Sequence, residues 1–94
     1  MQNRASPSNA ALEVREHLDR IETVNDTLNA VITVAADEAL TAAKAVDAAA
    51  EKGEWLGLLH GMPMLIKDNI DTAGIKTTSG ARFLANNIPN QDAP

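Results

Sequence analysis

Lys67 is the residue whose type and position in this sequence could support chemistry. It follows the apolar run 64–66, which begins after a Gly-Met-Pro start at 61–63 and is typical of a β-strand covered on both faces. Loss of hydration disfavours the charged form of a lysine side chain and lowers its pKa. A lysine in such a place can be neutral near pH 7 and act as a general base.

A different interpretation of Lys67 is a lysine at a strand end, whose stem covers apolar surface while the ammonium reaches solvent. Position alone favours this interpretation, because long charged side chains are rarely fully buried. Asp68 should point to the opposite face of the strand, so it need not pair with Lys67. We interpret Asp68 and Asn69 as acceptors for loop amides at the end of the strand.

Partners for a nucleophilic mechanism are scarce in this sequence. Serine occurs only at Ser6, Ser8 and Ser79. Ser79 follows Lys67 closely enough for a local dyad to be conceivable, but no nucleophile elbow surrounds it, and a turn hydroxyl is the better interpretation. His17 and His60 lack neighbours at ligand spacing, so we expect no metal site.

Composition excludes several classes of function. The chain has 94 residues and a net charge of -5, and its basic residues are scattered, so we expect no direct nucleic-acid partner. There is no cysteine, no apolar run long enough for a membrane span and no apolar core of a signal peptide near the start. We therefore expect a cytoplasmic location and no membrane partner.

Hydrophobic periodicity predicts two helices and two strands. An apolar stripe with spacings of three and four predicts a helix over about 8–24, which Asn25 and Asp26 should end. β-Branched residues predict a strand over about 30–34, and an alanine-rich stretch predicts a helix over about 36–52 that ends at Gly53. The run that contains Lys67 predicts a strand over about 63–69.

Several separated blocks of this sequence resemble the amidase signature enzymes. The block Gly61 to Asp71, with Thr72-Ala73-Gly74 and Thr77-Thr78-Ser79-Gly80 after it, is similar to the region around the family's catalytic lysine. Segments 20–22 and 28–34 resemble the family's N-terminal region, and Asp92-Ala93-Pro94 resembles the start of its next segment. The likeness covers nearly all of the chain beyond the first ten residues or so.

The resemblance implies a function in which Lys67 is the catalytic residue. In the family, the matching lysine belongs to a Ser-cis-Ser-Lys triad that forms an acyl-enzyme and hydrolyses carboxylic amides. The implied fold is α/β, a mixed β-sheet surrounded by α-helices, of which residues 1–94 would be the incomplete N-terminal part of one domain. Its partners would be a small-molecule amide and the missing C-terminal part of its own domain, with no cofactor.

The glycine- and serine-rich loop that supplies the family's two serines and its oxyanion-binding amides is absent from this sequence. We therefore predict that the 94-residue chain alone has no amidase activity. The sequence does not separate a stand-alone amidase from the glutaminase-type A subunit of a tRNA-dependent amidotransferase, and it leaves the oligomeric state open. A hypothesis of another class is a small non-catalytic helical module that docks through its alanine-rich stripe.

Overall fold

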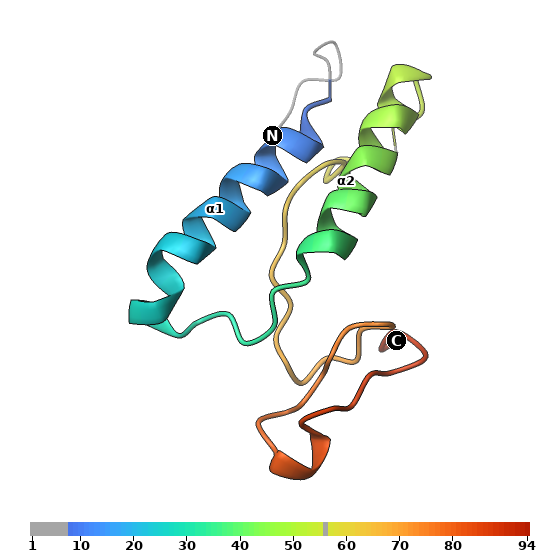
Figure 1. Ribbon diagram of the computed structural model, residues 1–94. Helices are drawn as coiled ribbons and strands as arrows, with labels where there is room; N and C mark the ends of the chain where they lie inside the picture. Colours follow the sequence, from blue (N-terminus) through green and yellow to red (C-terminus); the bar gives the residue numbers. More distant parts are fainter. Residues whose placement is uncertain (1–7, 56) are drawn as a thin grey trace. The chain divides into compact units, whose positions relative to one another are not determined.

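The computed structural model describes residues 8–55 and 57–94, and its elements follow the order α1, α2, η1 (Figure 1). Helix α1 is Ala10–Leu28, helix α2 is Ala36–Glu51, and η1 is a short 3-10 helix, Arg82–Leu84. The chain divides into two compact units. The residues up to Ala30 together with Ala36–Pro63 form the first, called the helical unit, which contains both helices. Val31–Ala35 and Met64–Pro94 form the second, called the loop unit.

Helices α1 and α2 lie side by side and antiparallel in the helical unit (Figure 1). Ala10 of α1 and Ala43 of α2 are the only buried apolar residues among the described positions. Such small side chains allow a close approach of two helices, but they bury little apolar area. Polar contacts therefore carry much of the specificity of this helix pair.

Asp47 of α2 caps the N-terminus of α1. Its carboxylate accepts hydrogen bonds from the backbone N–H of Ala10 at 2.8 Å, from the N–H of Ala11 at 3.0 Å and from the Ser8 hydroxyl. These amides belong to the first turn of α1, where no intrahelical acceptor exists. Because Asn9, the N-cap residue, makes no side-chain cap, the neighbouring helix supplies the capping oxygen.

The capped amides also change the acidity of Asp47. Burial raises its pKa, but the hydrogen bonds from Ser8, Ala11 and Ala10, together with the nearby charge of His60, outweigh that effect and leave the pKa below its ordinary value. The carboxylate is thus favoured in its ionised form, which is also the better partner for the positive end of the α1 dipole.

Helix α1 ends where Asn29 adopts a left-handed backbone conformation. Helix α1 continues past the predicted end at Asn25 and Asp26 to Leu28, and Asn29 closes it with φ 53° and its N–H bonded to the Asn25 carbonyl. Asparagine and aspartate cost a helix interior well under 1 kcal/mol, so they do not end α1 on their own. Ser6 and Pro7, whose residue types suit the start of a helix, lie outside the described residues.

The end of α2 matches the predicted stop at Gly53. Gly53 has φ 78° and donates its N–H to the Ala50 carbonyl, while the N–H of Glu54 bonds to the Ala49 carbonyl. This pair of bonds is a Schellman motif, and the positive φ of its central residue favours glycine. The described residues contain no helix that is both long and apolar enough to cross a membrane.

The predicted mixed β-sheet is wrong for this chain. Residues 8–55 and 57–94 contain no β-strand, and the segments 30–34 and 63–69 are irregular or extended without a strand partner. Strand propensity reflects how side chains fit a pleated, half-buried surface, and the described residues supply no such surface. The extended run is instead exposed, with Met64 at 71% and Leu65 at 73% of their surface.

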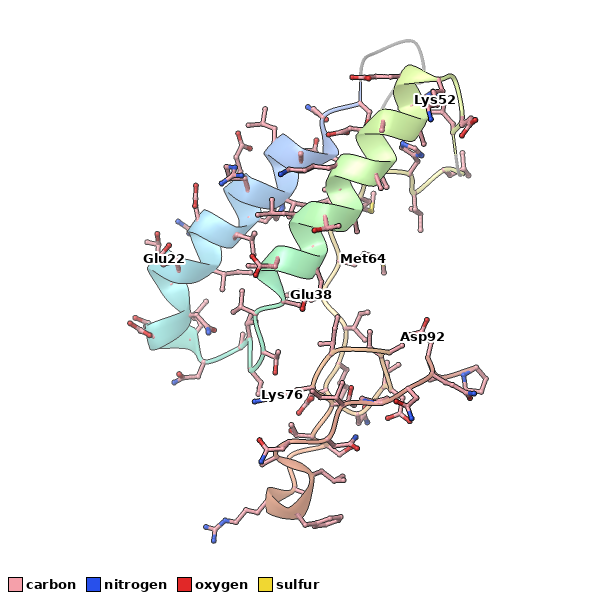
Figure 2. The ribbon with its side chains drawn as sticks, turned by 45° about the vertical axis from the view of Figure 1, so that its right-hand side comes forward. Glu22, Glu38, Lys52, Met64, Lys76 and Asp92 are labelled. Carbon is pink, nitrogen blue, oxygen red and sulfur yellow. The ribbon has the colours of Figure 1, made fainter. Side chains whose placement is uncertain are left out.

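The loop unit is held by backbone hydrogen bonds between segments 71–77 and 87–93. Three of these bonds join the two segments: Ala93 to Asp71 at 2.8 Å, Gly74 to Pro89 at 3.0 Å and Thr77 to Asn87 at 2.9 Å. The Asp92 carboxylate adds a bond from the N–H of Ala73 at 2.8 Å. Lys76 and Asp92, labelled in Figure 2, are both exposed in this unit.

Candidate active site

Lys67 lies at the end of the extended run in the loop unit, and its side chain is exposed. Of the two interpretations of Lys67, the described chain shows the one in which its ammonium reaches solvent, and the neighbouring apolar side chains are exposed as well. The Lys67 carbonyl accepts a hydrogen bond from the N–H of Ile70 at 3.0 Å. This bond starts a turn at 67–70, so the backbone direction changes directly after the lysine.

Asp68, the residue after Lys67, forms the best-connected group near the candidate base. Its carboxylate accepts hydrogen bonds from both the N–H of Thr78, at 2.8 Å, and the Thr78 hydroxyl. The backbone carbonyl of Asp68 accepts a further bond from the N–H of Ser79 at 2.9 Å. The interpretation of Asp68 as an acceptor for loop amides is thus confirmed. Asp68 also accepts a hydrogen bond from a hydroxyl.

These hydrogen bonds lower the pKa of Asp68. The Thr78 hydroxyl makes the largest contribution and the Thr78 N–H the next, a small burial effect opposes them, and the N–H of Gly80 adds to the lowering. A carboxylate that accepts several hydrogen bonds is stabilised in its charged form. The hydrogen bonds therefore favour the ionised form of Asp68 and direct its charge toward Thr78.

Ser79 and Gly80 form the tight turn that brings Thr78 back to Asp68. Their φ values are 51° and 73°, and the N–H of Ala81 bonds to the Thr78 carbonyl at 2.9 Å. Positive φ at both central positions defines a type I′ turn. Ser79 is exposed at this turn, which agrees with the interpretation of its side chain as a turn hydroxyl.

Thr77 anchors the loop next to this turn and is a buried polar residue, with only 3% of its surface exposed. Its hydroxyl donates to the Ile75 carbonyl at 3.2 Å and accepts from the N–H of Thr72 at 3.4 Å. Its carbonyl accepts from the Asn87 side-chain amide at 3.0 Å, in addition to the backbone bond between the same two residues. Thr77 is therefore held at the base of the loop by hydrogen bonds, and among the described residues of the loop unit no apolar side chain is buried.

His60 lies in the helical unit and is buried, with its ring centroid 4.5 Å from that of Trp55 and the two rings tilted by 45°. His17 is exposed on α1, and its Nδ1 lies 2.7 Å from the Glu13 carbonyl. Within the described residues, no three histidine, cysteine or acidic side chains gather where they could hold a metal ion.

The candidate lysine lies within the part of this chain that matches a known protein family. A family model described as Amidase matches residues 13–94, a range that includes Lys67, Asp68 and the loop that closes on Thr78. The chain belongs to the amidase family. No solved structure gives a significant match to it.

Relatives of this amidase-family chain carry two kinds of name. It is 49% identical over 76 residues to the A subunit of the glutamyl-tRNA(Gln) amidotransferase of Moorella thermoacetica, covering 81% of this chain and 16% of that protein. It is also 49% identical over 79 residues to the corresponding protein of Acidothermus cellulolyticus, covering 84% of this chain and 16% of that protein. With the indoleacetamide hydrolase of Bradyrhizobium diazoefficiens it shares 43% identity over 91 residues, 97% of this chain and 17% of the relative.

The chain thus spans about a sixth of the length of the relatives that it matches.

Two contacts of this amidase-family chain were not predicted from the sequence. The bond between Asp68 and the Thr78 hydroxyl spans 10 residues, and the Asp47 cap joins residues 36 to 39 positions apart. Local periodicity carries no signal for either contact, although a Thr-Thr-Ser-Gly turn after an Asp is a hint for the first.

Proposed function

We propose that this chain is the N-terminal part of a longer amidase, in which Lys67 is the general base for hydrolysis of a carboxylic amide. The observation that carries the proposal is the family match over residues 13–94, because it includes the lysine motif at 61–71 that the resemblance assigns to catalysis. The relatives, named for an amidotransferase and for an amide hydrolase, agree with chemistry at an amide bond.

The proposed chemistry needs a lysine that takes up a proton in its neutral form. By resemblance, a serine oxygen attacks the carbonyl carbon of the amide while its proton passes through a second serine to the amine of Lys67. The carbon–nitrogen bond then breaks, and the leaving amine takes up a proton. Water hydrolyses the resulting ester and releases the acid, so the reaction consumes one water and regenerates both serine and lysine.

In the described part of the chain, hydrogen bonds that hold the backbone after Lys67 support its proposed role. The turn at 67–70 and the bonds of Asp68 hold the residues on the C-terminal side of the lysine. The exposed apolar residues Met64, Leu65 and Ile66 on its N-terminal side leave surface that a longer chain could cover. Removal of water from the lysine would then depend on residues outside this chain.

The chain by itself should be inactive. Of the residues described, Ser79 is the serine nearest in sequence to Lys67, and it is an exposed turn residue. Stabilisation of an oxyanion requires preorganised donors around the reacting carbonyl, and removal of one such donor costs roughly 10²- to 10³-fold in rate. We therefore expect the 94-residue chain to release no ammonia from an amide above the uncatalysed rate.

A second candidate function is that of the glutaminase-type A subunit of a tRNA-dependent amidotransferase. The specific observation in its favour is that relatives at 49% identity are named as the A subunit of glutamyl-tRNA(Gln) amidotransferase. In this case the amide would be that of glutamine and the protein would act within a larger assembly. In the first case a small amide would be hydrolysed by the amidase alone. We propose a cytoplasmic location in either case.

The experiment that tests the proposed function begins with the coding sequence beyond Pro94. A serine- and glycine-rich segment there supports the proposal, whereas an immediate stop codon contradicts it and favours the small helical module. The full-length protein is then assayed for ammonia release from glutamine and from a panel of simple aliphatic and aryl-acetic amides. Release from the simple amides favours a stand-alone amidase, release from glutamine favours the amidotransferase component, and release from none contradicts both.

A further inference from the structure

We propose that Asp68 is a positioning residue for Lys67, because it closes the loop 68–80 through Thr78 and so fixes the backbone that carries the lysine. This inference rests on the proposed function, since it assumes that Lys67 is the base. It adds a role for a carboxylate that touches neither substrate nor reacting atoms in the proposed chemistry.

The hydrogen bonds of Asp68 hold the backbone next to the lysine. Both carboxylate oxygens of Asp68 and its backbone carbonyl accept hydrogen bonds from Thr78 and Ser79, so one residue is joined to the returning loop at three atoms. The carbonyl of Lys67 is joined to Ile70 on the other side. The peptide between Lys67 and Asp68 is thereby held from both ends, and rotation of this peptide would break at least one of these bonds.

The carboxylate of Asp68 is engaged by the returning loop. It accepts hydrogen bonds from the Thr78 amide and hydroxyl, and those bonds hold its pKa below the ordinary value. Its charge therefore helps to hold the loop 68–80 closed.

Asp71, three residues later in the same unit, lacks these bonds. Its side chain is exposed and, within the described residues, accepts no hydrogen bond, although its backbone carbonyl binds the N–H of Ala93. Loop closure is thus a property of Asp68 and not of acidic residues in this segment generally. Asp71→Asn therefore provides a control with the same change of charge.

The contact is tested first in the 94-residue chain by nuclear magnetic resonance. The Thr78 amide resonance should titrate with the Asp68 carboxylate, with a midpoint below the ordinary aspartate value of about 3.9. Asp68→Asn should abolish this titration, and Asp71→Asn should leave it in place. A Thr78 amide that shows no acidic titration, or one that titrates equally in Asp68→Asn, overturns the inference.

The positioning role is tested in the full-length enzyme by separating kcat from KM. Asp68→Ala should lower kcat by about 100-fold, because a displacement of about 1 Å in a catalytic group can have that effect, while KM should change less than about twofold. Thr78→Val should lower kcat by about tenfold, and Thr78→Ser should restore most of that loss because it regains the hydroxyl donor. Each variant is assayed below its thermal midpoint so that unfolding does not contribute.

Asp68→Ala with an unchanged kcat overturns the inference. A kcat loss in Thr78→Val that Thr78→Ser does not restore also overturns it, because the hydroxyl bond would then be irrelevant. Lys67→Ala is measured in parallel. If Lys67→Ala is inactive while Asp68→Ala is fully active, only the positioning role fails. If Lys67→Ala keeps its turnover, the proposed function fails and the inference fails with it.

Discussion

The capping of α1 by Asp47 gives a prediction whose size follows from the structure. In the variant Asp47→Ala, the N–H groups of Ala10 and Ala11 and the Ser8 hydroxyl lose their shared acceptor. Loss of a capping side chain costs about 0.5 to 2 kcal/mol, typically about 1. Because about 1.4 kcal/mol is a factor of ten, opening of the first turn of α1 should become about fivefold more frequent.

The assay is amide hydrogen exchange at Glu13, whose N–H makes the first intrahelical bond, to the Asn9 carbonyl at 3.0 Å. Protection of this amide should fall about fivefold in Asp47→Ala, in line with the loss of a cap. Glu51→Gln removes the same charge from an exposed position on the same helix and should leave Glu13 unchanged. Equal protection of Glu13 in wild type and Asp47→Ala would refute the cap.

The pH dependence of the cap has a definite sign. The pKa of Asp47 in the folded chain lies below its ordinary value, because the hydrogen bonds outweigh the effect of burial. The stabilisation is therefore fully present above the unfolded pKa of about 3.9 and is lost as the pH falls through the folded pKa. Protection of Glu13 relative to Asp47→Ala should be constant near neutrality and should shrink only in this acidic range.

Three further predictions concern turns and chemistry in the isolated chain. Ser79→Ile should lower hydrogen-exchange protection of the Ala81 amide roughly fivefold or more, because a β-branched residue at positive φ costs about 1 to 2 kcal/mol, whereas Ser79→Gly should preserve it. Asn29→Val should reduce helicity measured by circular dichroism, because the left-handed end of α1 excludes a β-branched side chain, and Asn29→Gly should not. Incubation of the 94-residue chain with an activated ester should give no acyl adduct on Ser79 by mass spectrometry, and such an adduct would revive the Lys67 and Ser79 dyad.

The helices of this chain could be predicted from sequence because their signals are local. The 3.6-residue period marks the helical segments, and Gly53 marks the end of α2 through the positive φ of a Schellman motif. The predicted end of α1 is wrong because Asn25 and Asp26 are only weak helix breakers. The residue that ends it is Asn29, which tolerates left-handed backbone.

Whether segments 30–34 and 63–69 form strands, and whether Lys67 is buried, could not be predicted from the sequence because both depend on distant partners. Apolar and β-branched residues give segments 30–34 and 63–69 the composition of strands, but a strand exists only when a neighbour accepts its hydrogen bonds. Among the described residues, no segment pairs with 30–34 or 63–69 as a neighbouring strand. Without that cover, the side chains of Leu65 and Lys67 are exposed to solvent.

The candidate site shows the same division between local and distant signals. The role of Asp68 as an acceptor for loop amides was predictable, because a short carboxylate at the end of an extended segment commonly bonds to nearby backbone. The choice of Thr78 as its partner, and the joint use of amide and hydroxyl, depend on the type I′ turn at Ser79 and Gly80. That turn decides which residue returns to Asp68.

The role of Lys67 as the base of amide hydrolysis is tested most directly by a pair of lysine variants in the full-length enzyme. Lys67→Ala should lower kcat/KM for the preferred amide by roughly 10²- to 10⁴-fold, the usual contribution of a general base. Lys76→Ala changes an exposed lysine of the same loop unit and should leave kcat/KM within about twofold of wild type, as is typical of surface substitutions. Equal activity of the two variants would contradict the catalytic role of Lys67.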